Sequence, residues 1–320
     1  MYDIIIVGGG PAGLTAAVYA LRAGKTVLVI EKGGFGGQIA FSPKVENIPG
    51  FSQISGAEFA DKFTEQAMSL GADMELETVI DVQKTNEGFQ VITEEGSTFR
   101  GKAVILAVGV KHRMLGLPGE EELVGKGLSF CAVCDGAFYT GMDTAMIGGG
   151  NSAMQEALLL SEVCRKVTIV QNLADFTGER KLAEALLAKD NVEVMFSTVV
   201  TGYETAGGEL TGLQLRSEVD GLQSKIAVDG AFLAVGLMPE NEAFSHLGKL
   251  NGWGYFDVGE DCCTETAGVY VAGDCRSKQI RQVVTAAGDG AIAAMAACRY
   301  LDRYIGIYLT KSAPSKGPLV

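Results

Sequence analysis

Two cysteines three residues apart, Cys131 and Cys134, are the clearest candidates for chemistry in the chain. They lie in a stretch that reads Phe-Cys-Ala-Val-Cys-Asp-Gly, where an acid, Asp135, follows the second cysteine. Cysteines at this spacing can close a small disulfide ring that opens and shuts without unfolding its surroundings. The pair has the form of a redox switch, and redox use requires a two-electron donor beside it.

A zinc site is the alternative use of a C-x-x-C pair, and it needs a second cysteine pair or a pair of histidines. The chain has only two histidines, and neither belongs to a paired ligand motif. Cys262 and Cys263 are adjacent to each other. We therefore predict no metal site. The remaining cysteines stand among apolar or small residues and are predicted to be buried thiols, namely Cys164, Cys275 and Cys298.

The composition favours an α/β protein of about two domains. The 320 residues are 47% hydrophobic and include 43 glycines but only 7 prolines, as expected for many tight turns between strands and helices. The net charge of -13 argues against nucleic acid as a partner, because phosphate binding needs clustered cations. No apolar run approaches the roughly 18 residues of a membrane span and no basic leader precedes the first strand. We predict a cytoplasmic protein with no membrane partner.

The N-terminal region has the pattern of a dinucleotide-binding fold. An apolar run at residues 3–7, suited to a central parallel strand, leads into the glycine turn 8–13 and then into a helical pattern. A second strand at residues 26–30 ends at an acid, Glu31. This is the complete G-x-G-x-x-G fingerprint, in which strand, helix and acid all stand in the required order.

Each residue of the fingerprint has a physical task. Gly8 makes the tight turn, Gly10 lets the backbone approach a pyrophosphate, and Gly13 allows helix and strand to pack closely. Glu31 can accept hydrogen bonds from ribose hydroxyls. A dinucleotide is therefore predicted to bind here.

The same pattern restarts after the cysteine pair. Residues 144–147 read as a strand, 148–153 as a second glycine turn, 154–160 as a helix and 166–170 as the next strand. The chain is thus predicted to contain two dinucleotide-type folds with the cysteine pair at the start of the second. This is the layout of a flavin disulfide reductase.

The other segments give coarser signals. A helix is predicted over residues 57–70, short strands over 79–110, and a small-residue helix over 283–297. An apolar strand ends at Asp274, which could reach a ribityl or ribose hydroxyl or could cap a helix. Residues 300–308 are aromatic and apolar, and the tail after them is predicted to be flexible or to dock late.

At this point the sequence closely resembles the low-molecular-weight thioredoxin reductase family, over residues 1 to about 302. The motifs that carry the resemblance are Gly8–Gly13, Gly37-Gln38, Val45–Gly50, Cys131–Gly136, Gly148–Ala153, Gly273-Asp274 and Arg281–Val283. The resemblance implies an α/β protein with two Rossmann-like folds, the second inserted into the first, in a three-layer ββα arrangement. The FAD-binding domain would comprise residues 1–113 and 241–320, and the second nucleotide-type domain residues 114–240.

The resemblance also implies a cofactor, its binding residues and an assembly. Family members are homodimers whose second domain rotates to present the cysteines alternately to flavin and to thioredoxin. The hinges would lie near Leu115–Pro118 and Gly236–Pro239. FAD would be held on the first fold by Gly8, Gly10, Pro11, Ala12, Gly13, Glu31, Lys32, Gly37, Gln38, Asn47, the backbone near Val82, Ala107, Val108, Gly109, Asp274, Arg281, Gln282 and Val283.

The second fold departs from the family pattern where NADPH is recognised. In the family a His-Arg-Arg segment, with another Arg further on, holds the 2'-phosphate after the strand. Here the corresponding positions are Gln171, Asn172, Leu173 and Thr177. No cation remains to pair with the phosphate, and Gln171 is not the acid that an NADH site would use. The pattern resembles ferredoxin-dependent flavin thioredoxin reductases or diflavin-linked disulfide oxidoreductases, which these motifs do not separate.

The predicted function follows from the resemblance. Electrons would pass from FAD to the Cys131–Cys134 disulfide and then to thioredoxin or a thioredoxin-like protein. Cys134 would face the flavin, and Asp135 would act as general acid or base, with a turn-capping role as its alternative. Which cysteine attacks the partner is not readable from the sequence.

Three alternative functions remain open. The first is a reductase with a donor other than NADPH, such as reduced ferredoxin, which would need a basic patch. Residues 111–113, or Arg276 and Lys278 with Arg281, are candidates for that patch. The second is an NAD(P)H-dependent thioredoxin reductase with non-standard nucleotide recognition, and the third is a flavin-bound redox sensor or scaffold.

Overall fold

A computed structural model describes residues 1–42 and 45–311, with side chains up to residue 302. It divides the chain into two compact units. Unit 1 contains residues 1–40, 57–111 and 239–320, and unit 2 contains residues 41–56 and 112–238. Both units have the α/β architecture with a parallel sheet at the centre, so the predicted fold class is confirmed.

Unit 1 is built on a sheet in the order β3-β2-β1-β6-β5-β4, with β17 paired to β6. The strands are β1 Tyr2–Val7, β2 Val27–Glu31, β3 Asp73–Leu76, β4 Val79–Thr85, β5 Gly88–Thr93, β6 Thr98–Leu106 and β17 Val269–Val271. The helices are α1 Pro11–Arg22, α2 Gly56–Ser69 and α6 Val283–Lys311, with short 3-10 turns η1 Gly37–Phe41 and η4 Glu242–Leu247.

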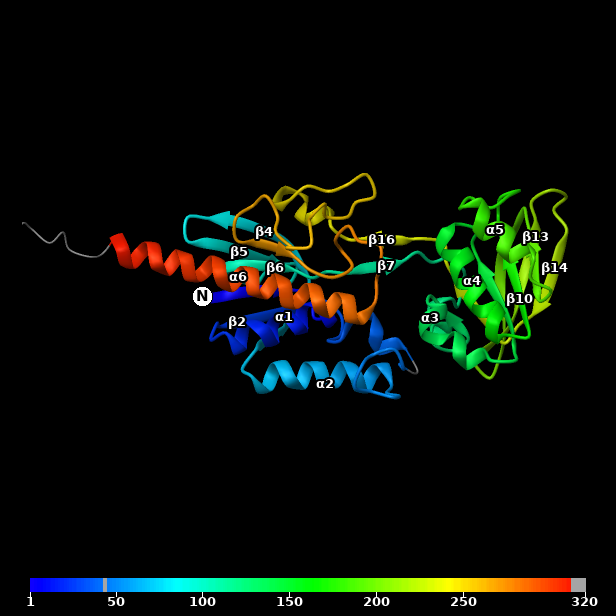
Figure 1. Ribbon diagram of the computed structural model, residues 1–320, viewed down its shortest axis with the longest axis horizontal. Helices are drawn as coiled ribbons and strands as arrows, with labels where there is room; N and C mark the ends of the chain where they lie inside the picture. The colour runs from blue at the N-terminus through cyan, green and yellow to red at the C-terminus, as the bar shows by residue number, and fades with distance from the viewer. Residues whose placement is uncertain (43–44, 312–320) are drawn as a thin grey trace, which may run out of the picture. The chain divides into compact units, whose positions relative to one another are not determined.

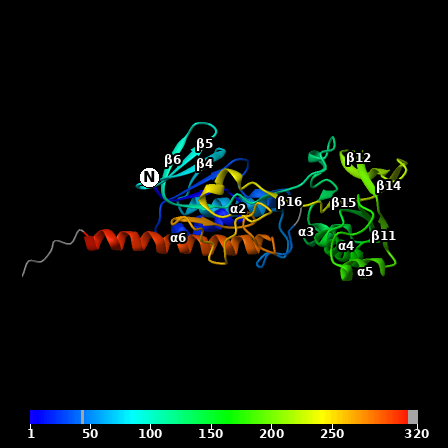
Figure 2. The same cartoon turned by 90° about the horizontal axis from the view of Figure 1, so that it is seen from above.

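The first strand is apolar and buried from Ile4 to Val7 because both of its faces are covered there. Ile4 and Ile6 pack against the layer of α1 and α6, whereas Ile5 and Val7 pack into the second core on the opposite face. Helices α1 and α6 lie side by side (Figure 1), and a side chain at Gly290 would meet the Ala12 carbonyl oxygen at 2.1 Å. The helix layer and the β4–β5 hairpin lie on opposite sides of unit 1 (Figure 2).

Unit 2 repeats the scheme with a parallel sheet in the order β11-β10-β9-β15-β8. Its strands are β8 Leu128–Ser129, β9 Asp143–Ile147, β10 Lys166–Val170, β11 Val192–Met195, β12 Thr198–Ala206, β13 Glu209–Ser217, β14 Gln223–Ala227 and β15 Gly230–Leu233. Its helical segments are α3 Ala132–Asp135, α4 Asn151–Val163 and α5 Arg180–Leu187, with η2 Glu121–Leu123 and η3 Gly136–Tyr139. The helices cover one face of the sheet and the antiparallel strands β12 to β14 cover the other (Figure 2).

The chain passes from one unit to the other at residues 40–41, 56–57, 111–112 and 238–239. The last two crossings lie in β7, Val110–His112, and β16, Leu237–Pro239, which pair as a two-stranded sheet. The first predicted hinge, Leu115–Pro118, lies instead inside unit 2. The reason is Glu120, a buried carboxylate that accepts hydrogen bonds from the backbone N–H groups of Leu115, Gly116 and Leu117 at 2.8–3.3 Å.

The C-terminal helix is longer than predicted. It begins at Val283 as expected but continues to Lys311, so the aromatic stretch 300–308 is part of the helix. The tail beyond Lys311 lies outside the described residues. In the described part of the chain, no helix is both long enough and apolar enough to cross a membrane.

Candidate functional site

The two cysteines of the redox motif form a disulfide, with Cα atoms 5.3 Å apart. Strand β8 leads into the motif, and the chain then turns into the four-residue helix α3. Cys131 precedes this helix in an extended conformation, and its sulfur accepts a hydrogen bond from the Cys134 N–H at 3.2 Å. The predicted small disulfide ring is therefore present, and both cysteines are half-buried.

Asp135 is tied to the same turn by two hydroxyl groups. Ser129 Oγ donates to one carboxylate oxygen at 2.6 Å, and Ser42 Oγ donates to the other at 3.2 Å. Ser129 Oγ also accepts from the Cys131 N–H at 3.2 Å, which couples the acid to the redox turn. Burial raises the pKa of Asp135, although the two hydroxyls oppose that shift. A buried carboxyl whose pKa is raised is suited to act as a general acid or base.

A second carboxyl beside the turn, Glu156 of α4, was not identified from the sequence. Its Oε2 accepts from the Ala132 N–H at 3.0 Å. Burial raises the pKa of Glu156 to about 7, and the hydrogen bond from Ala132 opposes the shift. A usable signal was in the sequence, since Glu156 stands within the apolar stripe of its helix, between Met154 and Leu160.

The first glycine turn is closely packed where the fingerprint requires it. Gly8 has φ +107°, and a side chain there would lie 2.3 Å from the Ala107 carbonyl oxygen. A side chain at Gly13 would lie 1.9 Å from the Gly8 carbonyl oxygen. At Gly10, by contrast, an added Cβ would meet only Gly37 Cα, at 3.8 Å. The backbone at Gly10 is therefore accessible to a ligand, as a pyrophosphate site needs.

Glu31 stands at the end of β2 and holds the turn in place. Its Oε2 accepts from the Gly9 N–H at 2.6 Å and its Oε1 from the Gly33 N–H at 2.9 Å. The neighbouring Lys32 forms an ion pair with Glu240. A cavity of about 210 Å³ opens here, lined by Val7, Gly8, Ile30, Glu31, Lys32, Glu77, Thr78, Val79, Val108, Glu240, Ala243 and Phe244.

Asp274 follows β17 and presents a buried acceptor. Its Oδ1 has no hydrogen-bond partner among the described residues, and Lys278 Nζ forms a long ion pair with it at 3.8 Å. Burial raises the pKa of Asp274, although the charges of Lys278 and Arg281 oppose the shift. A buried carboxylate oxygen requires a donor, and a ribityl or ribose hydroxyl supplies one. The accessible glycine turn and this acceptor both fit FAD.

The other residues predicted to bind FAD occupy several elements. Gln38 lies in η1 and donates to the Val110 carbonyl oxygen. Ala107, Val108 and Gly109 follow β6 directly. Gln282 and Val283 lie at the start of α6, and the Arg281 guanidinium stacks over Tyr255, 4.3 Å from the ring centroid.

Two of the predicted residues lie in different surroundings. Asn47 is exposed and belongs to the segment 41–56 of unit 2. Val82 is fully buried in β4, and its carbonyl oxygen lies 2.8 Å from His246 Nε2. The cavity is lined instead by Thr78 and Val79, earlier along the chain.

The second glycine turn keeps its backbone geometry. Gly148 has φ +127°, and the Gln171 side chain packs over Gly149 while its Nε2 donates to the Asp175 carbonyl oxygen at 3.0 Å. Thr177 Oγ1 donates to the Gly149 carbonyl oxygen at 3.3 Å. The first cation that follows Thr177 in the chain, Arg180, is exposed and pairs with Glu184 at 2.7 Å.

The candidate basic patch that includes Arg276 and Lys278 is wrong. Arg276 and Lys278 are buried, and both bind the carboxylate of Asp289, at 2.8 and 2.9 Å. In the other patch Lys111 pairs with Glu240 at 2.7 Å. His112 there stacks on Phe130, and burial lowers its pKa to about 4, so that it is neutral near pH 7. Arg276 and Lys278 are thus engaged within the fold, whereas Lys111 and Arg113 of the other patch are exposed.

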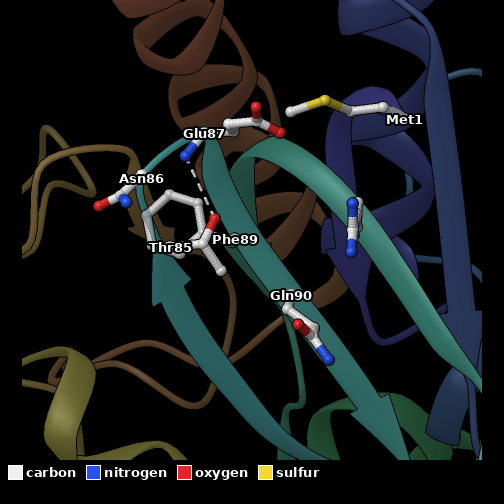
Figure 3. A pocket seen from close by; sticks show the side chains of 7 residues that line it. Met1, Thr85, Asn86, Glu87, Phe89 and Gln90 are labelled. Atoms are coloured by element: carbon white, nitrogen blue, oxygen red, sulfur yellow. Dashed lines mark hydrogen bonds between the residues drawn. The ribbon is translucent and has the colours of Figure 1, made fainter.

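A second pocket lies at the tip of the β4–β5 hairpin (Figure 3). It is lined by Met1, Thr85, Asn86, Glu87, Phe89, Gln90 and Arg100. The Glu87 N–H donates to Thr85 Oγ1 across it at 3.3 Å. None of its residues belongs to the predicted site, and we assign it no function.

Two dinucleotide-type folds, an accessible glycine turn and a disulfide with an acid beside it define a flavin-dependent disulfide oxidoreductase. Residues 2–290 match the model of the pyridine nucleotide-disulphide oxidoreductase family. The chain belongs to this family, and it is an FAD-dependent enzyme of the thioredoxin reductase type.

Individual relatives agree over nearly the whole chain. The thioredoxin reductase of Listeria monocytogenes is 40% identical over 302 residues, which cover 94% of each chain. That of Bacillus subtilis is 38% identical and covers 94% of this chain and 95% of its own. The crystal structure of thioredoxin reductase from Streptococcus pyogenes superimposes with a TM-score of 0.88 at 35% identity, covering 95% of this chain and 99% of the other.

Proposed function

We propose that this protein is a thioredoxin reductase that transfers electrons from FAD through the Cys131–Cys134 pair to the disulfide of thioredoxin or a thioredoxin-like protein. The observation that carries the proposal is the disulfide itself, closed in a short turn with Asp135 held directly beside it. The match to thioredoxin reductases over 94% of the chain supports the choice of partner.

The residues of the turn perform the exchange. When bound, FAD supplies the two electrons that open the disulfide. A thiolate from the opened pair attacks the partner disulfide, a mixed disulfide forms, and the second cysteine resolves it. We assign proton transfer to Asp135, because its raised pKa lets it protonate a departing thiolate and then recover the proton.

FAD binding is assigned to unit 1. The pyrophosphate would lie over Gly10 at the start of α1, and Asp274 would accept from a hydroxyl of the cofactor. The remaining residues predicted to bind FAD keep that assignment as part of the proposal. The division into an FAD domain and a second nucleotide-type domain, the homodimer and the cytoplasmic location remain predictions as well.

For the electron donor we favour a nicotinamide nucleotide, because residues 2–290 match the pyridine nucleotide-disulphide oxidoreductase family. The burial of Arg276 and Lys278 also removes one cationic surface that an acidic ferredoxin would need. We therefore propose NAD(P)H, bound at the second glycine turn without the usual arginines, as the donor.

One observation favours a donor other than NADPH as the second candidate. The segment 171–177 contains no cation, and the side chains of Gln171 and Thr177 are turned to backbone carbonyl oxygens of their own fold. A 2'-phosphate would then lack its arginine partners. Reduced ferredoxin is the donor we name for this case.

Anaerobic stopped-flow measurement of the flavin absorbance, with NADPH, NADH or reduced ferredoxin in turn, separates these candidates. Bleaching by a nucleotide at micromolar concentration supports the first, and bleaching by ferredoxin alone supports the second. Turnover is then measured with thioredoxin in a Cys131→Ser variant and in a Cys263→Ser control, since Cys263 is exposed and outside the pair. Cys131→Ser should abolish turnover and the control should keep it. Turnover at the parent rate in Cys131→Ser would refute the dithiol mechanism, and a chain inert with every donor would be a redox sensor.

A further inference from the structure

Glu156 is the one ionisable side chain at the redox turn that the proposed mechanism does not use. It lies on α4, and its Oε2 accepts from the Ala132 N–H at 3.0 Å. Ala132 directly follows Cys131 and is the first residue of α3. The carboxylate thus accepts a backbone hydrogen bond at the start of this turn, directly after Cys131 in the chain.

The position of Glu156 is fixed by packing. Ala132 belongs to the same buried cluster as Ala157 and Leu160 of α4. A side chain at Gly136 would lie 3.1 Å from Leu160 Cδ2, so the turn and the helix are in close contact. Glu156 lies on this face one turn before Leu160, because residues four apart share a helix face.

The segment that contains the turn and α4 has acids and no cation. Residues 127–164, which include the turn and all of α4, contain no lysine, arginine or histidine. The other ionisable groups of these elements near the turn are Asp135, whose pKa is raised by burial, and Tyr139, whose pKa is raised to about 12. His112, which stacks on Phe130, is neutral because burial lowers its pKa to about 4.

We propose that Glu156 is a positioning residue of the redox pair, whose carboxylate holds the turn and opposes negative charge on Cys131, so that the reduced pair is a strong reductant. Opening the disulfide breaks the Sγ–Sγ bond and adds two electrons. The two sulfurs then take up two protons, which gives a dithiol, or one proton, which gives one thiol and one thiolate. A nearby carboxylate destabilises the thiolate form. The reduced state is then less stable, and the pair passes its electrons on more readily, as a reductant of thioredoxin must.

This inference rests on the proposed thioredoxin reductase function, but its test does not depend on the donor or the partner. The holoenzyme is equilibrated with mixtures of reduced and oxidised dithiothreitol at pH 8.5 and pH 5.5, quenched with acid and alkylated. The Cys131–Cys134 peptide is then quantified by mass spectrometry. Wild type is compared with Glu156→Gln, which keeps an acceptor for Ala132, and with Glu162→Gln, the same change at an exposed position of the same helix.

At pH 8.5 we expect Glu156→Gln to favour the reduced pair about tenfold, or about 30 mV. At pH 5.5 wild type and variant should agree within about twofold, because Glu156, with a pKa of about 7, is then protonated in wild type. Glu162→Gln should match wild type at both values. No shift at pH 8.5, a shift of the opposite sign, or an equal shift at both values would overturn the proposal, since a purely structural role does not depend on the charge.

A second measurement covers the case in which Glu156→Gln does not fold. The rate at which iodoacetamide alkylates Cys131 in reduced wild type is followed from pH 6 to pH 10. The proposal expects a thiol pKa above the ordinary value of about 8.5. A pKa at or below that value would overturn it. Failure of the proposed function would appear elsewhere, as absent turnover with thioredoxin.

Discussion

Substitution of Asp289 by asparagine tests the buried charge cluster that supports the flavin site. Asp289 accepts four hydrogen bonds: from Arg276 Nε at 2.8 Å, Arg276 Nη2 at 2.9 Å, Lys278 Nζ at 2.9 Å and the Gly273 N–H at 3.1 Å. The three charged side chains are each at most 10% exposed. Burial alone would raise the pKa of Asp289, but the bonds from Arg276 and Lys278 outweigh it and lower that pKa.

The magnitude follows from these contacts. Asparagine keeps the size of the side chain but removes its charge and replaces one acceptor oxygen with an amide NH₂ that faces the donors. Arg276 and Lys278 are then buried without a counter-charge, which costs about 3 to 5 kcal/mol of unfolding free energy. Because Gly273 directly precedes Asp274, we also expect FAD to bind at least about tenfold more weakly, equivalent to about 1.4 kcal/mol.

The assay is urea unfolding followed by circular dichroism, with the same excess of FAD in every sample because a bound ligand adds stability. Asp257→Asn is the matched control, since Asp257 forms an exposed ion pair with Lys249 at 2.9 Å and its loss should cost less than about 1 kcal/mol. If Asp289→Asn lies within about 1 kcal/mol of wild type, the cluster does not support the fold in the way described.

Two further outcomes follow from the geometry. Gly8→Ala should yield a chain without flavin, because its Cβ would lie 2.3 Å from the Ala107 carbonyl oxygen. Gly24→Ala, at φ +74° with open space around it, should keep the flavin. Flavin content is read from the ratio of absorbance at 450 and 280 nm, and retention in both variants would refute the argument. His112→Phe should remove a pH dependence, because burial lowers the His112 pKa to about 4 while the unfolded chain titrates near 6.5. The unfolded state then binds more protons between these values, so wild type should lose about 2.5 kcal/mol, relative to the variant, from pH 7.5 to pH 4.5 in urea unfolding. A constant difference between the two proteins would mean that His112 is not held neutral.

The spacing of motif residues and the periodicity of apolar residues predicted a large part of the fold. The first fold was predicted from the apolar strand at residues 3–7, the glycine turn and Glu31. These features depend on backbone conformation and side-chain periodicity within short segments of the chain. The repeat at residues 144–170 predicted the second fold for the same reason. The Cys131–Cys134 disulfide also closes within four residues.

The tertiary structure decided which charges are buried and what they contact. Arg276 and Lys278 were predicted to belong to a surface patch because their partner, Asp289, lies on a different element, at the other side of a turn. Glu120 holds residues 115–117, where a hinge was predicted, through backbone hydrogen bonds that the sequence pattern does not predict.

Glu156 makes the same point at the redox turn. Its residue type and its place in a helix are visible in the sequence, but its contact with Ala132 exists only because α4 packs against α3. A sequence specifies short-range geometry directly, whereas the environment of an ionisable group is set by chain segments brought together from a distance. The cysteine pair was therefore predictable from the sequence, and the carboxylate beside it became visible only in the fold.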